Sequence, residues 1–379
     1  MDFELSETHL SIRNAARAFA QREVTPYATR WSQEERFPTE LVPKLAEAGF
    51  LGLMLPSRYG GSELDTLAYA LVVEELSRAD GSVGITVASH NGLGSSHILA
   101  FGSDALKERC LPRLASGEWL GAWALTEAGS GSDSAALRTR AERRGDDWCL
   151  NGSKMFITQG SVAGVCVVLA STDPSKRHHG ITAFAIERGT HGFSTNKLKG
   201  KAGVRASDTA ELVLEDVIVP DSQRVGPEGT GFTGAMSILD KGRISIAAMA
   251  LGLGEGAFDA ARNYAQERKQ FGKELASFQT IAFMLADMRT ELDAARLLIY
   301  RAAALADAGR PFAVEASMAK LFASEVAQRV CDLAVQIHGG YGYIDDFPVA
   351  RHLRDVRLCR IGEGTSEVQR SIIARHVCK

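Results

Sequence analysis

The chain lacks several features that would point directly to a class of protein. Disulfide and metal-site patterns are absent: there is no CxxC pair and no histidine at a matching spacing. The thiols are therefore expected to be buried or incidental in a reducing compartment, and no metal site is predicted. The six cysteines, scattered through 379 residues, are Cys110, Cys149, Cys166, Cys331, Cys359 and Cys378.

An excess of one charge and long apolar runs are also lacking. The formal net charge is -3, from 43 lysines and arginines against 46 aspartates and glutamates. Nucleic acid and anionic membranes are therefore not expected as partners. No apolar run reaches the roughly 18–20 residues of a membrane span. Residues 1–4 are acidic and begin no apolar run, so we expect a cytoplasmic protein without a secretory signal.

What is present falls into three stretches that differ in the spacing of their apolar residues and in their turn signals. Residues 1–118 have helical spacing of apolar residues, with Ser6 as a predicted N-cap and Gly49 as a helix stop. Residues 119–230 alternate short apolar runs with turn signals, which predicts an antiparallel β domain built as a sandwich or barrel. Residues 231–379 return to long helices rich in alanine and leucine, at about 232–268, 277–308 and 313–338, which predicts a bundle.

Two turns and two glycine-rich stretches need separate interpretation. Gly145-Asp146-Asp147 and Asn151-Gly152 are predicted turns, the second of them a type I′ hairpin. Residues 252–256 read GLGEG inside a helical pattern, so close helix contact explains them better than a dinucleotide fingerprint. Residues 226–231 lack the lysine that would follow in a P-loop.

Two segments of the β region combine small, polar and aromatic residues. Residues 123–133 (WALTEAGSGSD) form a glycine- and hydroxyl-rich loop whose N–H groups can approach a polar ligand, or they form a plain hydrophilic turn. Residues 151–160 (NGSKMFITQG) place Phe156 and Thr158 on one strand face. That face could line a flat ring system or be an ordinary sheet edge.

Further candidate segments border the C-terminal helices. Residues 267–273 (ERKQFGK) are a basic helix end and turn suited to a phosphate, although such runs are often only solvated. Residues 336–343 (QIHGGYGY) precede residues 360–370 (RIGEGTSEVQR). There Glu363 lies between two glycines, so neighbouring side chains cannot shield its carboxylate, and Thr365 is a possible helix cap. Alone, such a turn is usually only a turn.

Taken together, these segments resemble the signatures of the acyl-CoA dehydrogenase family, in the same order and over essentially the whole chain. The seven matching segments are ALTEAGSGSD, NGSKMFIT, GVRASDTAEL, LEDVIVP, RKQFGK, QIHGGYGY and EGTSEVQR. The resemblance implies an N-terminal helical domain, a central β domain and a C-terminal four-helix bundle. It also implies non-covalent FAD, a homotetramer built as a dimer of dimers, and an electron-transferring flavoprotein as electron acceptor.

The resemblance assigns cofactor-binding residues in three groups. The group expected around the flavin ring comprises Trp123, Leu125, Thr126, Ser132, Phe156 and Thr158. The group expected to reach the FAD of a neighbouring subunit comprises Arg268, Gln270, Phe271, Gln279, Gln336, Gly339 and Gly340. Thr365 and Glu367 are expected at the adenosine diphosphate part. A site split in this way would bind FAD poorly in a monomer.

For the substrate, the resemblance points to Ser132, Asp240, Arg243 and the backbone of Gly364. It identifies Glu363 with the base that removes the proton beside the thioester carbonyl of an acyl-CoA. A hydride would leave the next carbon for flavin N5, giving the trans-2-enoyl-CoA. The Glu363 N–H and a flavin ribityl hydroxyl would stabilise the developing enolate, and desolvation would make the carboxylate more basic.

Two positions depart from the pattern of some family members. Gly242 occupies the place where some relatives carry their base on the bundle helix, so Glu363 has no rival. Gly362 stands where straight-chain enzymes commonly carry tyrosine, which predicts that the site accepts short or branched acyl groups. Chain length, pathway and a CoA or carrier-protein thioester stay open. Alternatives are an oxygen-using relative (an acyl-CoA oxidase or flavin monooxygenase-like enzyme) and a catalytically silent helical scaffold.

Overall fold

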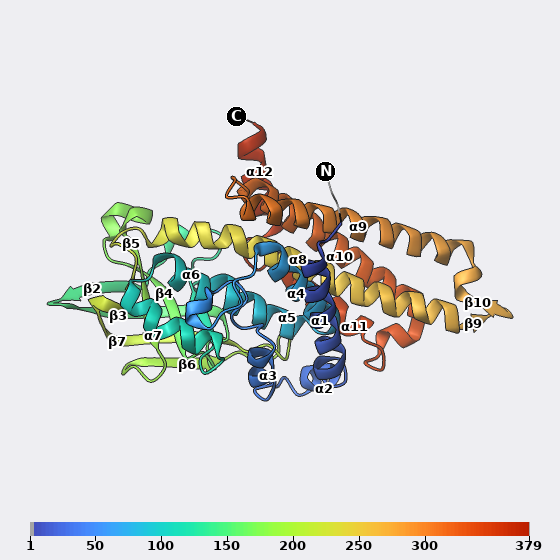
Figure 1. Cartoon of the computed structure of the whole chain (residues 1–379), viewed down its shortest axis with the longest axis horizontal. Coiled ribbons are helices and arrows are strands. Elements are labelled where there is room, and N and C mark those ends of the chain that lie inside the picture. Colours follow the sequence, from blue (N-terminus) through green and yellow to red (C-terminus); the bar gives the residue numbers. More distant parts are fainter. Residues whose placement is uncertain (1–3, 379) are drawn as a thin grey trace.

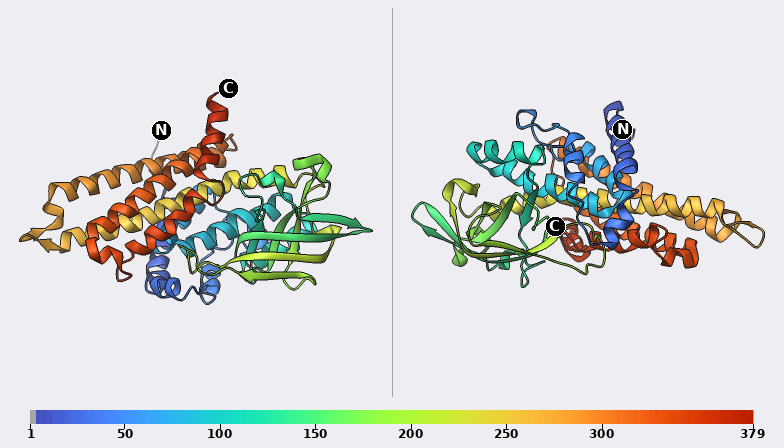
Figure 2. Two further views of the ribbon diagram at one scale, coloured as in Figure 1. Left: turned by 180° about the vertical axis from the view of Figure 1, so that it is seen from behind. Right: turned by 90° about the horizontal axis from the view of Figure 1, so that it is seen from below.

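The computed structural model describes residues 4–378. Residues 1–3, part of the segment used to predict the absence of a secretory signal, and residue 379 lie outside the described residues. The molecule is elongated, with strands gathered at one end and a pair of long helices joined by a small hairpin at the other (Figure 1). The first helices of the N-terminal third pack beside the middle of this long axis, and the last two lie next to the strands (Figures 1 and 2).

The N-terminal third is helical, as predicted. Ser6 caps α1 by accepting a hydrogen bond from the His9 N–H at 3.2 Å, and Asp65 caps α4 through the Ala68 N–H at 2.8 Å. Each acceptor satisfies one N–H that the first helical turn leaves free. The helices are α1 (Glu7–Phe19), α2 (Ala28–Gln33), α3 (Leu41–Glu47), α4 (Thr66–Ala79), α5 (Gly81–Ser89), α6 (Ser96–Phe101) and α7 (Asp104–Ala115), with π-helical segments at Ala20–Val24 and His90–Ser95.

The strands form one mixed sheet, in the order β6-β7-β3-β2-β4-β5-β8. Most neighbouring pairs are antiparallel, but β1 lies parallel to β4, a pairing that the sequence did not indicate. Inward-facing apolar side chains form a separate core with Trp148 and Phe184. The strands are β1 (Gly121–Ala124), β2 (Arg140–Arg144), β3 (Asp147–Thr158), β4 (Val165–Ser171), β5 (Ile181–Glu187), β6 (Phe193–Lys197), β7 (Thr209–Pro220) and β8 (Arg224–Val225).

The predicted hairpin at Asn151-Gly152 is wrong. Strand β3 continues through both residues and pairs with β7 on either side of a register shift between Leu150 and Gly152. Gly152 has φ 146°, and a Cβ there would press on Thr139. An Asn-Gly pair meets the needs of a bulge as well as those of a turn. The turn at residues 145–147 is confirmed, since it joins β2 to β3.

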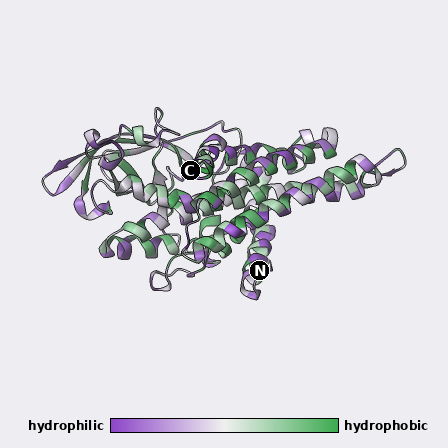
Figure 3. Ribbon diagram, turned by 90° about the horizontal axis from the view of Figure 1, so that it is seen from above, coloured by the Kyte–Doolittle hydropathy of each residue, from purple (hydrophilic) through white to green (hydrophobic). Residues whose placement is uncertain are grey.

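The C-terminal part is built on α8 (Gly231–Glu267), which runs from the sheet to the hairpin of β9 (Lys269–Gln270) and β10 (Lys273–Glu274). Helices α9 (Gln279–Asp307) and α10 (Ala313–His338) pack along it, and α11 (Val349–Val356) and α12 (Ser366–Val377) follow. By length and composition α8 could cross a membrane, but 83% of its apolar window is buried within the protein. The helices along the molecular centre are the most apolar (Figure 3).

The glycines of residues 252–256 confirm close helix contact as their explanation. A Cβ on Gly252 would overlap the carbonyl oxygen of Glu74, and one on Gly256 would overlap that of Arg78. Both carbonyls belong to α4, so the missing side chains let α4 and α8 approach each other.

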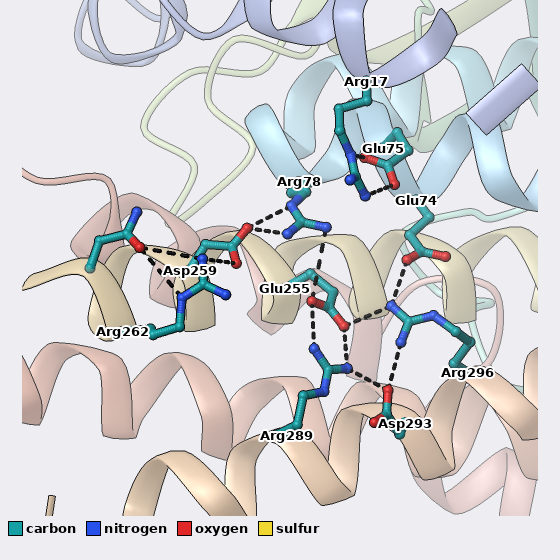
Figure 4. A network of polar contacts seen from close by, with 11 residues as sticks. Arg17, Glu74, Glu75, Arg78, Glu255, Asp259, Arg262, Arg289, Asp293 and Arg296 are labelled. Atoms are coloured by element: carbon teal, nitrogen blue, oxygen red, sulfur yellow. Dashed lines mark hydrogen bonds and ion pairs between the residues drawn. The ribbon is translucent and has the colours of Figure 1, made fainter. Parts of the chain in front are cut away.

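Charged residues also connect α4 to α8 and α9 (Figure 4). The buried carboxylate of Glu255 accepts hydrogen bonds from Arg289 at 2.6 Å and from Arg296 at 2.7 Å. Arg296 also donates to the buried Glu74 at 2.9 Å, while the neighbouring Glu75 binds Arg17 of α1. The ion pairs therefore hold the N-terminal helices against the bundle.

Candidate active site

Glu363 lies in the turn between the 3₁₀ segment Arg357–Arg360 and α12. Its φ is 53° and that of Gly364 is 94°, so two consecutive residues are left-handed. A glutamate in this region costs about 1–2 kcal/mol, which the surrounding contacts must offset. Thr365 ends the turn by accepting a hydrogen bond from the Val368 N–H at 3.3 Å, which confirms it as the cap of α12.

The turn directs the Glu363 carboxylate against α8. A Cβ placed on Gly242 would overlap Glu363 Oε2, and Leu93 lies beside the same point. Glu363 Oε2 is buried and has no hydrogen-bond partner among the described residues. The Glu363 N–H likewise makes no hydrogen bond within residues 4–378. A buried acceptor and a free donor on one residue are what a polar ligand would satisfy.

Burial raises the pKa of Glu363 to about 7, although Lys320 and Arg243 act in the opposite direction. Arg243 is buried on α8 and forms an ion pair with Asp240 one turn earlier. Burial also raises the pKa of Asp240, against the influence of Arg243. The site thus places a carboxylate that titrates near neutrality beside a buried, paired cation.

The loop after β1 is held by a buried ion pair. Lys154 of β3 donates to Glu127 Oε1 at 2.8 Å and to the carbonyl of Leu125 at 3.1 Å. Glu127 also accepts from the Thr139 N–H at 2.9 Å, and the Met155 N–H donates to the carbonyl of Thr126 at 2.9 Å. The loop is therefore fixed before any ligand binds.

The residues predicted to surround the flavin lie on this loop and on β3. Trp123 is buried and donates to His97 at 2.8 Å. Thr126 and Thr158 are partly exposed, and neither hydroxyl is hydrogen-bonded within the described part of the chain. Phe156 has φ 61° in a second irregularity of β3 and is 66% exposed. Free hydroxyls beside an exposed aromatic ring fit a planar cofactor with polar edges.

A second group of predicted cofactor residues lies at the far end of α8. A cleft of about 490 Å³ is lined by Arg268, Gln270, Gly339 and Gly340. Phe271, at the tip of the β9–β10 hairpin, is 94% exposed. Gln279, Gln336 and Phe271 do not line this cleft. His338, which lies within the range 336–340 expected at the cofactor, does line it, as do Tyr264 and Tyr341, for which no role was predicted.

The two groups are too far apart to serve one cofactor in one chain. Trp123 and Leu125 share a core with Ala235 and Ile238, in the first turns of α8, whereas Arg268 follows its last residue. A helix of 37 residues is about 55 Å long. Figure 1 shows the strands and the hairpin at opposite ends of the molecule.

Family models match the chain along most of its length. The N-terminal domain of acyl-CoA dehydrogenase matches residues 6–118, the middle domain residues 122–217 and the C-terminal domain residues 229–378. The chain belongs to the acyl-CoA dehydrogenase family. Members of this family depend on FAD, so the chain is a flavoprotein oxidoreductase of that type.

Individual relatives agree with this assignment. The short-chain specific acyl-CoA dehydrogenase of Clostridium acetobutylicum is 48% identical over 374 residues, covering 99% of each chain. The structure of butyryl-CoA dehydrogenase from Megasphaera elsdenii matches with a TM-score of 0.98 at 44% identity and covers 100% of both chains. A chain solved in work on the electron transferring flavoprotein of Acidaminococcus fermentans matches with a TM-score of 0.99 at 44% identity, again over 100% of both.

Sequence reasoning missed two lysines of this acyl-CoA dehydrogenase. Lys154 was part of a recognised segment but had no assigned role, and Lys320 was not singled out. Both side chains are completely buried. A lysine in a strand or in an alanine-rich helix is normally exposed, so its burial carries the signal and only the structure reveals it. Ser132, predicted for both cofactor and substrate, lies in an exposed part of the loop.

Proposed function

We propose that this acyl-CoA dehydrogenase converts short or branched acyl-CoA thioesters to trans-2-enoyl-CoA, with Glu363 as the base. The observation that carries the proposal is the unpartnered, buried Oε2 of Glu363 beside Gly242. A general base works best when its pKa lies near the working pH, and burial brings the pKa of this carboxyl to about 7.

The chain's own groups supply the other requirements of proton removal. The free N–H of Glu363 can donate to the thioester carbonyl and stabilise the negative charge that develops there. The buried Arg243, its partly exposed ion-pair partner Asp240 and the backbone of Gly364 contribute to substrate placement. When bound, FAD supplies the acceptor, at N5, for the hydride that leaves the neighbouring carbon.

The proposed cofactor site is shared between two chains. Trp123, Leu125, Thr126, Ser132, Phe156 and Thr158 would bind the flavin, with Thr365 and Glu367 at the adenosine diphosphate part. The second chain would contribute Arg268, Gln270, Phe271, Gln279, Gln336, Gly339 and Gly340. The separation of these groups along α8 supports a dimeric site. Exposed apolar side chains on α9, α10 and the following turn, including Phe283, Leu297, Phe322 and Tyr343, support further association to a homotetramer.

Gly362, next to the proposed base, bears on which acyl groups the site accepts. A Cβ on Gly362 would meet nothing closer than 3.6 Å, an ordinary van der Waals distance, so a small side chain would fit there and glycine leaves that volume unfilled. The names of several relatives specify short-chain substrates. We therefore propose short acyl chains with tolerance of branching. A kcat/KM series that favours long unbranched chains, with isobutyryl- and isovaleryl-CoA inert, would contradict this.

The decisive experiment is an acyl-CoA panel with an artificial electron acceptor, run on the wild type and on Glu363→Gln. The variant is expected to keep its yellow FAD and its oligomeric state, and to lose turnover by about 10²–10⁴-fold or more. Retained turnover would remove Glu363 from the mechanism. Loss of FAD would instead show a structural effect, and Glu363→Asp would then separate the two explanations.

The electron acceptor is proposed to be an electron-transferring flavoprotein, and the compartment the cytoplasm. Anaerobic bleaching by acyl-CoA followed by slow reoxidation in air is expected. Rapid reoxidation with stoichiometric peroxide would favour an acyl-CoA oxidase on the same fold. A colourless oligomer that takes up no FAD would favour a silent scaffold.

A further inference from the structure

Lys320 is a buried cation without a carboxylate partner. It lies in the first third of α10 among buried alanines and serines, and its side chain is completely inaccessible. Its ammonium donates to the carbonyl of Gly364 at 2.7 Å. No ion pair of Lys320 occurs among residues 4–378. An ammonium in such surroundings is expensive to keep, so its retention calls for a role beyond filling space.

The acceptor of this hydrogen bond is the turn that carries the base. Gln369 of α12 donates to the carbonyls of Glu363 at 3.3 Å and of Gly364 at 2.9 Å. The turn formed by the two left-handed residues therefore accepts hydrogen bonds from two helices: from a neutral amide on α12 and from a cation on α10. The carbonyl of Gly364 accepts hydrogen bonds from both Lys320 and Gln369. The two contacts share one acceptor and differ in the charge of the donor.

We propose that Lys320 is a positioning residue for Glu363, whose buried ammonium holds the Gly364 carbonyl and so keeps the Glu363 carboxylate directed at Gly242. The proposal rests on the role of Glu363 as base. It extends that role by naming the group that maintains the strained turn. A small displacement of a reacting group costs about 10²-fold in rate, so a residue that never contacts substrate can still control turnover.

The charge of Lys320 has a second consequence for Glu363. Burial raises the pKa of the Glu363 carboxyl to about 7, and Lys320 is the stronger of two cations that limit the rise. Burial lowers the pKa of Lys320 itself to about 8. The other titratable or charged groups around this pair are Arg243 and Asp240 on α8, Tyr69 on α4, Cys359 in the 3₁₀ segment and Glu367 on α12.

Three variants separate the contact from the charge. Lys320→Gln removes the charge and keeps a donor, Lys320→Met removes both, and Gln369→Leu removes the neutral donor and keeps the charge. In both Lys320 variants the acidic limb of the kcat profile is expected to move up by about one pH unit. Plateau kcat is expected to fall about 10²-fold in Lys320→Met and less in Lys320→Gln. Gln369→Leu is expected to lower kcat without moving the limb.

A readout independent of turnover is the infrared difference titration of the Glu363 carboxyl, identified as the band missing in Glu363→Gln. Its midpoint is expected to rise in both Lys320 variants, each studied as the FAD-loaded oligomer. The proposal would be overturned if both Lys320 variants kept the wild-type acidic limb of the kcat profile and the wild-type midpoint of the Glu363 titration. It would also be overturned if Gln369→Leu shifted that limb and midpoint as much as the Lys320 variants do. If Glu363→Gln stays active, the assignment of the base fails, whereas the infrared titration still reports whether Lys320 acts on Glu363.

Discussion

At the scale of single residues, the site depends on an absent side chain as much as on a present one. Glu363 Oε2 occupies the space that a Cβ of residue 242 would fill. The carboxylate also has no hydrogen-bond partner among the described residues. Its position is therefore fixed by the backbone of its turn and by the shape of the surrounding walls.

Gly242→Ala is expected to displace the carboxylate rather than to unfold the protein, because the end of a flexible side chain can move. We expect kcat to fall about 10²-fold and the melting temperature to change little. Steady-state kinetics and thermal denaturation test this. Gly362→Ala is the control, since its nearest neighbour would be 3.6 Å away, and it should keep kcat for butyryl-CoA within a few-fold. Equal losses in both variants would contradict the steric explanation.

The raised pKa of Glu363 predicts how activity depends on pH. The base must be ionised, so kcat/KM is expected to fall as the pH drops through about 7, by about tenfold per unit below it. The effect on stability has the opposite sign. The folded state holds this proton more tightly than the unfolded chain, whose carboxyl has a pKa of 4.5, so this group costs stability as pH rises from 4.5 to about 7. A kcat/KM value that stays constant between about pH 5 and pH 8 would exclude Glu363 as the base.

At the scale of elements, the contact between α4, α8 and α9 combines missing side chains with buried charge. Glycines of α8 let the helices approach, and Glu255 then lies among arginines that hold it in its ionised form. Burial alone would raise the pKa of Glu255, but Arg289 and Arg296 lower it to about 2.

Glu255→Gln is expected to destabilise the protein by about 3 kcal/mol, because it leaves two partly buried arginines without the buried carboxylate that they share. Urea denaturation at neutral pH measures this. Asp293→Asn is the control in the same network: its carboxylate is 58% exposed, so it should cost less than about 1 kcal/mol. The lowered pKa means that the contribution of Glu255 is complete above pH 4.5 and is lost as pH falls through about 2.

The elements also show where reasoning from sequence succeeds and where it fails. The three long helices of the bundle and the cap at Ser6 were predictable, because periodicity and capping are local. The bulge at Gly152 was not, since its cause is pairing with β7 some 60 residues later along the chain. The parallel β1–β4 pair has the same kind of cause.

Site residues divide in a similar way. Glu363 and Thr365 could be found from one short segment, and the structure places both in the turn that begins α12. Lys320 could not, because its partner lies 44 residues away and nothing in an alanine-rich helix marks one lysine as buried. Ordered motifs therefore pointed to the proposed base, whereas the residue proposed to position it was found only from the packing.

At the scale of the whole molecule, the two halves of the proposed cofactor site lie at opposite ends of α8. The single chain exposes Phe271 almost completely on its terminal hairpin. Exposed apolar groups of this kind mark surfaces that another molecule covers.

Phe271→Asp is expected to weaken both assembly and FAD retention, because it places a charge in the proposed contact with the neighbouring subunit. Light scattering after size exclusion gives the mass, and the ratio of flavin to protein absorbance gives the occupancy. Ile218→Asp, at a half-exposed apolar position on β7, should leave both unchanged. A Phe271→Asp protein with wild-type mass and full FAD would place the hairpin outside the shared site.

The overlap between the space of residue 242 and the carboxylate of Glu363 also limits how the family can diversify. A side chain at position 242 would force the carboxylate of Glu363 out of its present position, so a substitution there that precedes a change at position 363 is expected to weaken the proposed base. Moving the proposed base from the turn to α8 is therefore expected to need paired substitutions, with each single mutant less active than either enzyme that carries one complete base. The residues at positions 242 and 363 should therefore be inherited together. The location of the base should separate the early-diverging groups of the family more reliably than acyl specificity does.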